Sequence, residues 1–430
     1  MRQSTYETDR DMQDRAILVS LITPDIKRSS VDPEHSLEEL VNLAETAGVE
    51  VLSMMTQQKE ARDTKWFIGK GKVEELRAAA EELGATTAIF DQELSGAQVR
   101  NLEAALNMKI IDRTQLILDI FAQRAKTREG IIQVELAQLS YLLPRLSGHG
   151  KNLSRLGGGI GTRGPGESKL ETDRRHIRGR ISDLKSQLDE VVRHRNLHRE
   201  RRRKAGVQQV ALVGYTNAGK STLLREMTKA DVYVENQLFA TLDPTSRNLE
   251  LPSGKEIVLT DTVGFIQNLP HDLIAAFRAT LEEVCEADLV LHVVDSASPM
   301  REEQKAVVER ILGELGAAGK PQITIYNKID LCRQDGSLLI PASNENTLVM
   351  SAYCADDLLK LRQLIQDKMT GDTRTFIFPA ERGDLIALAY RTGEVTDQEV
   401  DGDTLKMTVE LNKQDYEVHG YKLESYIEHQ

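Results

Sequence analysis

The sequence has no long apolar segment and little cysteine. No apolar run approaches the roughly 18 residues that cross a bilayer, and the opening stretch, MRQSTYETDRDMQ, has no apolar region behind its arginines, as a secretory signal would. The three cysteines, Cys285, Cys332 and Cys354, are scattered and form no CxxC pair, which argues against a disulfide framework and a zinc site. We therefore expect a cytoplasmic protein without stable membrane insertion.

Length and charge narrow the class further. The 430 residues, 40% hydrophobic and 28% charged, predict a globular chain of two to four domains. The formal net charge of −12 hides a basic segment, because residues 145–205 carry 17 Lys or Arg against 7 Asp or Glu. One basic segment in an acidic chain indicates a local contact with a polyanion and not general nucleic-acid coating. We expect no DNA partner, and a monomer.

The first domain, residues 1–112, alternates between β-rich runs and helical patterns, which predicts a small parallel sheet flanked by helices. The expected strands are Ala16–Ile22, Val49–Met54, Thr86–Phe90 and Lys109–Ile111. The expected helices are one capped by Ser36 and ended by Gly48, then Val73–Leu83 and Ser95–Leu106. The string IGKGK (68–72) lacks the full spacing of a phosphate loop and is interpreted as a tight turn before a helix.

Residues 113–205 are expected to form a helical hairpin. One helix runs from Arg113 to about Leu143 with a weak point at Gly130, and the other from Ser168 to about Lys204. Apolar residues at heptad spacing in the second helix favour antiparallel, lengthwise packing on the first; they are Leu170, Ile177, Ile181, Leu184, Leu188 and Val191. The loop between the helices (148–167) is so rich in glycine that it buries nothing by itself.

Residues 206–371 return to strands and helices, and this predicts a mainly parallel sheet with helices on both faces. The expected strands are Val210–Val213, Ile257–Thr260, Leu289–Val294, Ile323–Tyr326 and Leu348–Met350. After Thr375 the helical pattern ends, and alternation in Thr404–Leu411 indicates a small terminal α/β or β-containing domain, 372–430. The fold class is therefore α/β.

A phosphate-binding loop is the clearest motif. Gly214–Ser221 reads GYTNAGKS, which fits G-x-x-x-x-G-K-[ST] between an expected strand and an expected helix. Amides of such a loop hold phosphate oxygens, Lys220 is assigned to the β- and γ-phosphates, and Ser221 to Mg²⁺. The alternative is a glycine turn without a ligand. The predicted loop residues are Gly214, Tyr215, Thr216, Asn217, Ala218, Gly219, Lys220 and Ser221.

Three further strings follow at strand ends, where such sheets bind ligands. In DTVG, Asp261 can hold Mg²⁺ through water and Gly264 can offer an amide to the γ-phosphate. In NKID, Asp330 can accept hydrogen bonds from guanine N1 and N2, donors that adenine lacks on that edge. Asn327 suits N7, Lys328 packs across the ring, and an amide near Ser351 reaches O6. The predicted residues are Asp261, Thr262, Val263, Gly264, Asn327, Lys328, Ile329, Asp330, Ser351, Ala352 and Tyr353.

The segment FATLDPT (239–245) is interpreted as a switch that orders on the triphosphate. Thr241 is the candidate second protein ligand of Mg²⁺, with Thr245 as a rival and an ordinary β-turn as the alternative. The residues assigned to nucleotide are Phe239, Ala240, Thr241, Leu242 and Asp243. Phe265 occupies the position where a glutamine would orient the attacking water. Because an apolar side chain cannot do this, we expect slow intrinsic hydrolysis that a partner accelerates by ~10³–10⁵.

These motifs resemble one family. GYTNAGKS, FATLDPT and DTVGF, with the upstream signature GGGIGTRGPGESKLETDRR (157–175), are similar to the HflX family in the Obg–HflX group of GTPases, over roughly residues 15–370. The resemblance implies a cytoplasmic enzyme that hydrolyses GTP to GDP with Mg²⁺. It also implies binding to the large (50S) ribosomal subunit and splitting of stalled ribosomes under heat or other stress.

The basic hairpin fits ribosomal RNA under this resemblance. The loop has no aromatic residue, so backbone and shape contacts are expected instead of base stacking. The alternative is a solvated helix face with a flexible tip. The candidate RNA-binding residues are Lys151, Arg155, Arg163, Arg174, Arg175 and Arg178. Two other functions stay open: a GTP-dependent regulator of a protein or membrane complex, and an RNA-remodelling factor in which hydrolysis is incidental.

Overall fold

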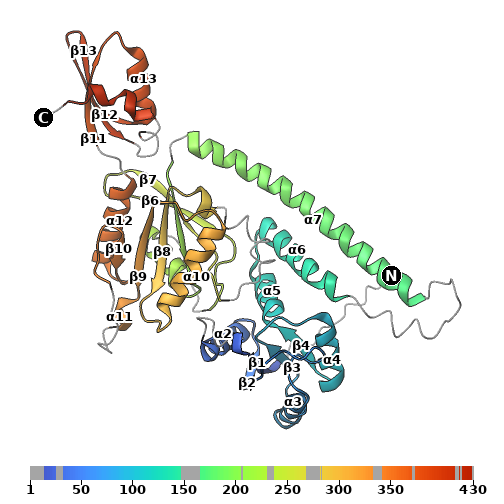
Figure 1. Ribbon diagram of the computed structural model, residues 1–430. Coiled ribbons are helices and arrows are strands. Elements are labelled where there is room, and N and C mark those ends of the chain that lie inside the picture. Colours follow the sequence, from blue (N-terminus) through green and yellow to red (C-terminus); the bar gives the residue numbers. More distant parts are fainter. Residues whose placement is uncertain are drawn as a thin grey trace, which may run out of the picture.

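The computed structural model describes residues 14–25, 32–146, 165–204, 207–229, 237–267, 281, 283–332, 341–369, 373–411, 416 and 419–428. Three sheets organise these residues (Figure 1). They comprise a four-stranded sheet near the N-terminus, a six-stranded central sheet and a three-stranded sheet near the C-terminus. Within the described ranges, no helix combines the length and apolar character that a bilayer crossing requires.

The first sheet is parallel, as its pattern predicted, with strand order β2-β1-β3-β4. Its strands are β1 (Arg15–Ile22), β2 (Glu50–Gln58), β3 (Thr87–Phe90) and β4 (Lys109–Asp112). Alternate residues of β1 enter different cores: Ala16 and Leu18 pack with α2, whereas Ile17 and Val19 pack with α3 and α4. These helices are α2 (Pro33–Thr46), α3 (Lys70–Leu83) and α4 (Gly96–Leu106).

Two helix starts show how local residues set the boundaries. Gly69 is the N-cap of α3 and residues 70–72 form its first turn, so IGKGK is the start of a helix and not a turn before it. The expectation that Ser36 caps α2 is wrong. Asp32 is the cap, with its carboxylate accepting from the Glu34 amide and with Pro33 as the first helical residue. Ser36 is buried instead, and its hydroxyl donates to Asp91 at 2.9 Å.

The long helix expected after Arg113 is two helices, α5 (Arg113–Arg124) and α6 (Arg128–Arg145). The break falls at residues 125–127 and not at Gly130, which lies in the first turn of α6. Thr127 is the N-cap of α6, and its hydroxyl accepts from the Gly130 amide at 3.0 Å. A tertiary contact with Asp243, described below, holds this corner, so the sequence of the helices alone did not show it.

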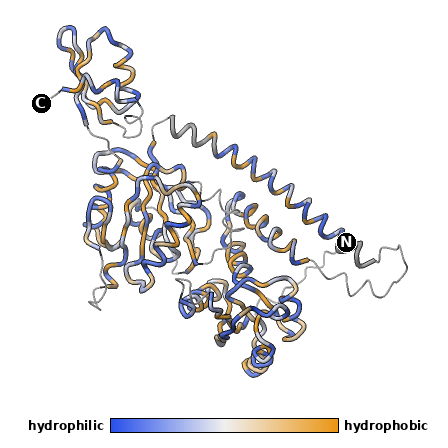
Figure 2. The backbone as a smooth tube through the Cα atoms, in the orientation of Figure 1, coloured by the Kyte–Doolittle hydropathy of each residue, from blue (hydrophilic) through white to orange (hydrophobic). Residues whose placement is uncertain are grey.

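α7 (Pro165–Lys204) forms the expected hairpin with α6 (Figure 1). Leu184 is buried against Ile132 and Leu136, and Ile181, Leu188 and Val191 pack around them. Two ion pairs flank this seam, Arg180 with Glu135 at 2.6 Å and Arg195 with Glu129 at 2.7 Å. Figure 2 shows that most of the long helix is hydrophilic, so only its narrow apolar seam is covered. The connecting loop lies outside the described residues.

The central sheet has the order β10-β9-β8-β5-β7-β6 and is parallel except for β6. Its strands are β5 (Gln209–Gly214), β6 (Thr245–Glu250), β7 (Glu256–Asp261), β8 (Leu289–Asp295), β9 (Gln322–Asn327) and β10 (Thr347–Val349). Its helices are α8 (Lys220–Thr228), α10 (Arg301–Glu314), α11 (Ile329–Cys332) and α12 (Ala355–Met369). Five strands match the expected ones. The sequence missed β6, whose alternating polar residues face away from the core.

The terminal sheet is antiparallel, with strand order β11-β13-β12. Its strands are β11 (Thr373–Pro379), β12 (Gly393–Asp401) and β13 (Thr404–Leu411), followed by the short 3₁₀ helices Gly420–Lys422 and Glu424–Tyr426. The expectation that helices end after Thr375 is wrong, because α13 (Gly383–Thr392) covers one sheet face. Leu385 and Ala389 of α13 pack on Phe376, Phe378 and Met407.

A buried histidine makes the stability of the central sheet depend on pH. His292 of β8 is fully buried, and its Nδ1 pairs with the Gln322 amide nitrogen at 3.2 Å. Burial, with Lys305 and Lys220 nearby, lowers the pKa of His292 to about 3. Between about pH 6.5 and 3 only the unfolded chain takes up this proton. The free energy of unfolding should therefore fall by up to roughly 1.4 kcal/mol per pH unit below pH 6.5 from this residue.

We expect His292→Leu to reduce that slope, because the substituted side chain does not titrate. Urea unfolding at pH 7 and pH 5 measures it as the difference between the two free energies of unfolding. His176→Leu, at an exposed position of α7, is the matched control and should leave the slope unchanged. A slope that stays the same in His292→Leu would show that other groups cause it.

Candidate nucleotide site

The phosphate loop joins β5 to α8 and requires glycine at two positions. Gly214 has φ +156°, and a Cβ there would meet the Val293 carbonyl oxygen at 2.2 Å. Gly219 has φ +95°, and its Cβ would meet the Asn327 amide nitrogen at 2.4 Å. No side chain caps the N-terminus of α8 at Gly219. The loop therefore folds tightly between two neighbouring strand ends and presents a helix N-terminus, which favours an anion.

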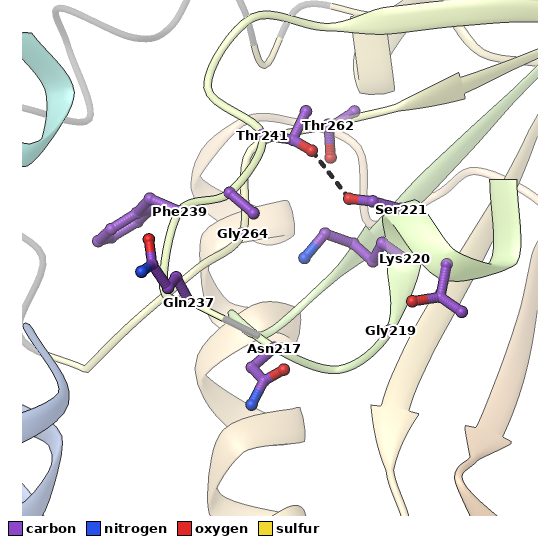
Figure 3. Close-up of a pocket in the computed structure, with 11 residues that line it drawn as sticks. Asn217, Gly219, Lys220, Ser221, Gln237, Phe239, Thr241, Thr262 and Gly264 are labelled. Carbon is purple, nitrogen blue, oxygen red and sulfur yellow. Dashed lines mark hydrogen bonds between the residues drawn. The ribbon is translucent and has the colours of Figure 1, made fainter. Parts of the chain in front are cut away.

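Lys220 is the first residue of α8, and its side chain folds back over this loop. Its ammonium donates to the carbonyl oxygens of Gly214 at 3.1 Å and Tyr215 at 2.9 Å. Burial lowers the pKa of Lys220 to about 8, with the Asp261 carboxylate opposing this effect. Gly264 lies opposite the ammonium (Figure 3), and a Cβ there would approach the Lys220 nitrogen to 3.0 Å. A buried ammonium facing a glycine backbone is suited to a polyphosphate, whose charge favours the protonated lysine.

The expected metal ligands come together beside the loop. The Ser221 hydroxyl lies 2.8 Å from the Thr241 hydroxyl (Figure 3) and donates to Asp261 at 2.7 Å. Burial raises the pKa of Asp261, and Lys220 and Ser221 offset part of this rise. The other carboxylate oxygen of Asp261 is buried and has no hydrogen-bond partner among the described residues. This donor set, two hydroxyls and a carboxylate, contains only oxygen and fits Mg²⁺. The rival Thr245 begins β6 and pairs with Asp261 in the sheet.

The base-side pocket lies at the ends of β9 and β10, next to the phosphate loop. Asp330 is exposed there, at the start of α11. Asn327 links the surrounding loops, because its amide nitrogen donates to the Ala218 carbonyl at 3.0 Å and its oxygen accepts from the Ala352 amide at 3.0 Å. One hydrogen of that amide group stays available for a base nitrogen. The pocket is lined by Asn217, Gly219, Thr222, Asn327, Lys328, Asp330, Leu331, Ser351, Ala352 and Tyr353.

The sequence missed several residues of this site. The Lys328 ammonium donates to the carboxylate of Asp295, at the end of β8, at 2.8 Å and to the Asn217 carbonyl at 2.7 Å. These two acceptors hold the Lys328 side chain in place. Asp357 of α12 accepts from the Ser351 amide at 3.1 Å and positions the loop after β10. Gln237 lines the phosphate pocket with Lys220, Thr241 and Gly264. Asp295 ends the apolar strand β8, which pairs with the strand that leads into NKID. A carboxylate at the end of this strand could have been predicted from the sequence to lie at the site.

Some residues assigned to the nucleotide have other side-chain contacts. The Tyr215 hydroxyl donates to Glu39 of α2 and accepts from the Gln267 amide at 2.7 Å. Leu242 is buried in the core that the central sheet shares with α2 and α5, and Asp243 bonds to the corner between α5 and α6. Phe239 both lines the phosphate pocket and packs edge-on against Phe121 of α5, with ring centroids 4.7 Å apart. Ala240 and Thr262 also line that pocket.

Two other assigned residues, Val263 and Ile329, support the loops around the site, as does Phe265. Val263 and Phe265 are buried in the same shared core. The Phe265 carbonyl accepts from the Thr216 amide at 2.7 Å, which joins the DTVG segment to the phosphate loop. The Ile329 amide donates to the Met350 carbonyl at 3.3 Å. These residues shape the site through the backbone and the core.

The central sheet is mainly parallel and carries a phosphate loop, a hydroxyl–carboxylate cluster at Ser221 and Asp261, and a pocket for the base that Asp330 helps to line. Together these features define a GTPase of the P-loop class. Three family descriptions match successive parts of the chain. "GTP-binding GTPase N-terminal" matches residues 34–122, "GTP-binding GTPase Middle Region" 124–202 and "50S ribosome-binding GTPase" 209–328.

Curated relatives extend this similarity over nearly the full length. GTPase HflX of Caldanaerobacter subterraneus is 51% identical over 407 residues, which cover 94% of this chain and 92% of that one. GTPase HflX of Escherichia coli K12 is 46% identical over 360 residues, covering 83% and 84%. The crystal structure of SsGBP with GDP is 24% identical, with a TM-score of 0.46, and covers 83% of this chain and 98% of that one. The chain belongs to the HflX family of GTPases; it binds and hydrolyses GTP.

Proposed function

We propose that this GTPase uses Mg²⁺ and binds the large ribosomal subunit in its GTP form, splitting stalled ribosomes in the cytoplasm under stress such as heat. The observation that supports it most is the hairpin of α6 and α7. α7, with 40 residues, is more than twice as long as α6, with 18 residues, and extends past both ends of it (Figure 1). Arg175 and Arg178 are exposed and Arg174 is half-buried on the N-terminal half of α7. Lys151, Arg155 and Arg163 lie outside the described residues.

The nucleotide site supports the switch half of the proposal. Lys220 would bind the β- and γ-phosphates, Asp330 the guanine edge, and Lys328 the face of the ring. Ser221 and Thr241 would hold Mg²⁺ directly and Asp261 through water, and the metal would neutralise phosphate charge. Phe265 is 1% exposed and has no group that could orient water. Hydrolysis by the isolated protein should therefore be slow, and the ribosome should supply the missing positioning.

Cosedimentation with large ribosomal subunits tests the proposal. We expect binding with a non-hydrolysable GTP analogue, weaker binding with GDP, and a loss of ~10³–10⁵ in affinity between 50 and 200 mM salt if six to ten phosphates are contacted. Deleting residues 150–164 should abolish subunit binding while GTP affinity stays unchanged. Subunits should accelerate hydrolysis by ~10³–10⁵.

Other outcomes separate the alternatives. Replacing Arg174, Arg175 and Arg178 by Ala should weaken subunit binding. The matched control replaces Lys305, Arg310 and Lys320 of the central domain by Ala, which removes the same number of positive charges and should leave binding unchanged. Nucleotide-independent binding would favour an RNA-remodelling factor. No subunit binding at all would favour a regulator of another protein. Turnover of ~1 s⁻¹ or more without subunits would contradict the proposed partner-dependent hydrolysis.

A further inference from the structure

The corner between α5 and α6 binds the switch segment through Asp243. The carboxylate of Asp243 accepts from the backbone amides of Lys126 at 2.8 Å and Thr127 at 2.9 Å, and from the Thr127 hydroxyl. A Cβ at Gly130 would meet the Asp243 carboxylate oxygen at 2.3 Å. The glycine in the first turn of α6 therefore leaves the space into which this carboxylate fits.

This contact is stronger than an ordinary surface hydrogen bond. Its acceptor is charged, and such bonds are shorter and about twice as strong as neutral ones. The carboxylate also lies at the N-terminus of α6, where a negative charge is favourable. Thr127 bridges both interactions, because its hydroxyl donates to Asp243 and accepts from the Gly130 amide.

The chain just before Thr241 is also attached to the N-terminal region, through Leu238 and Phe239. The Leu238 amide donates to the Thr46 hydroxyl of α2 at 3.3 Å. The Phe239 ring packs on Phe121 of α5. Thr241 therefore lies between two points that the N-terminal region fixes, and its hydroxyl lies 2.8 Å from that of Ser221. Two residues of extended chain span at most about 7 Å, so the position of Asp243 restricts where Thr241 can be.

We propose that Asp243 is a positioning residue for GTP binding, which holds Thr241 at the metal site by bonding to the N-terminus of α6. The proposal rests on the assignment of Thr241 to the metal of the triphosphate complex. Asp243 lines neither pocket of the nucleotide site, and its carboxylate bonds to the corner between α5 and α6, so it would act through Thr241. Its effect is therefore confined to the state in which Thr241 takes part, the one with a γ-phosphate.

The experiment compares nucleotide affinity of the full chain at limiting Mg²⁺. Asp243→Asn keeps the size of the side chain but replaces one acceptor oxygen by an NH₂ group. That group would face the amide and hydroxyl donors of Lys126 and Thr127 and could not accept their hydrogen bonds. We expect about tenfold weaker binding of a non-hydrolysable GTP analogue, with GDP affinity within about twofold of the unsubstituted protein. Glu250→Gln, an exposed substitution at the end of β6, is the matched control and should change neither affinity.

A double-mutant cycle with Thr241→Ala separates positioning from general stability. If Asp243 acts through Thr241, adding Asp243→Asn to Thr241→Ala should cause little further loss of GTP-analogue affinity. Thr127→Ser keeps the hydroxyl and should preserve affinity, whereas Thr127→Val should weaken it. Additive losses, or equal losses for GDP and the analogue, would overturn the proposal. If Thr241→Ala itself has no effect, the metal assignment fails instead.

Discussion

Asp330→Asn is expected to move the base preference of this GTPase from guanine to xanthine. The carboxylate of Asp330 is exposed in the base-side pocket, beside Asn327 and Lys328. It is assigned to accept from N1 and N2 of guanine. An amide replaces one acceptor by a donor, which opposes the N2 group of guanine and suits the C2 oxygen of xanthine. Sites that rely on such hydrogen bonds discriminate by ~10⁴–10⁵, so the ratio of GDP to XDP affinity should fall by about that factor.

Competition of GDP, XDP and ADP against a fluorescent nucleotide measures this change. Asp356→Asn is the matched control, because Asp356 lies exposed in the first turn of α12, near the pocket. Its nucleotide preference should stay that of the unsubstituted protein. An unchanged preference in Asp330→Asn would refute the assignment of this carboxylate to the base. A loss of all nucleotide binding in that variant would do the same, because the phosphate loop does not depend on Asp330.

Arg113→Met is expected to lower the free energy of unfolding by about 3–5 kcal/mol. The Arg113 guanidinium is buried, donates to Asp91 at 2.8 Å and pairs with Glu39. Burial opposes its charge, but the Glu39 and Asp91 carboxylates outweigh this and raise the pKa of Arg113. Removal of the guanidinium leaves two carboxylates, each nearly buried, without their cation. Uncompensated buried charge is among the largest single sources of destabilisation.

The loss should extend to the phosphate loop. Glu39 also accepts from the Tyr215 hydroxyl, so Arg113 and Tyr215 share one carboxylate between α5 and the loop. Burial, then Glu39, raises the pKa of Tyr215, which keeps this hydroxyl a donor. Urea denaturation measures the change in stability. Lys109→Met, which removes an exposed pair with Asp14, should cost under about 1 kcal/mol.

A rescue variant tests the mechanism. Adding Asp91→Asn and Glu39→Gln to Arg113→Met removes both unpaired charges and should recover part of the stability. A loss in Arg113→Met as small as that in Lys109→Met would show that the pair contributes little. Absence of recovery in the triple variant would assign the loss to packing and not to charge.

Periodicity predicted most of the fold. Alternating and continuous apolar runs placed four strands of the first sheet and five of the central one, because a buried strand needs apolar residues over its whole length. Heptad spacing placed α7 against α6, and the seam at Leu184 confirms it. Two short elements were missed. β6 has alternating exposed polar residues, and α13 is a ten-residue helix whose apolar face, with Leu385 and Ala389 buried, was overlooked.

The sequence predicted well which side chains meet at the phosphate loop. It predicted poorly which side chains pack against other elements and hold the loops of the site in place. Ser221, Thr241 and Asp261 lie together as expected. In contrast, Leu242 and Asp243 were assigned to the nucleotide but contact the N-terminal region. A sequence motif shows that a residue belongs to a segment near the nucleotide. Whether its side chain points toward the nucleotide depends on which other elements pack against that segment.

The amino-acid sequence by itself determined the phosphate loop, its class and the two helices of the hairpin. These features depend on contiguous residues, since glycines at positive φ and heptad spacing act over one turn or one helix. Only the tertiary structure decided that Asp243 reaches the α5–α6 corner and that Tyr215 reaches Glu39, residues 116 or more positions apart. Such contacts depend on how two separately folded surfaces pack, and no local pattern specifies that.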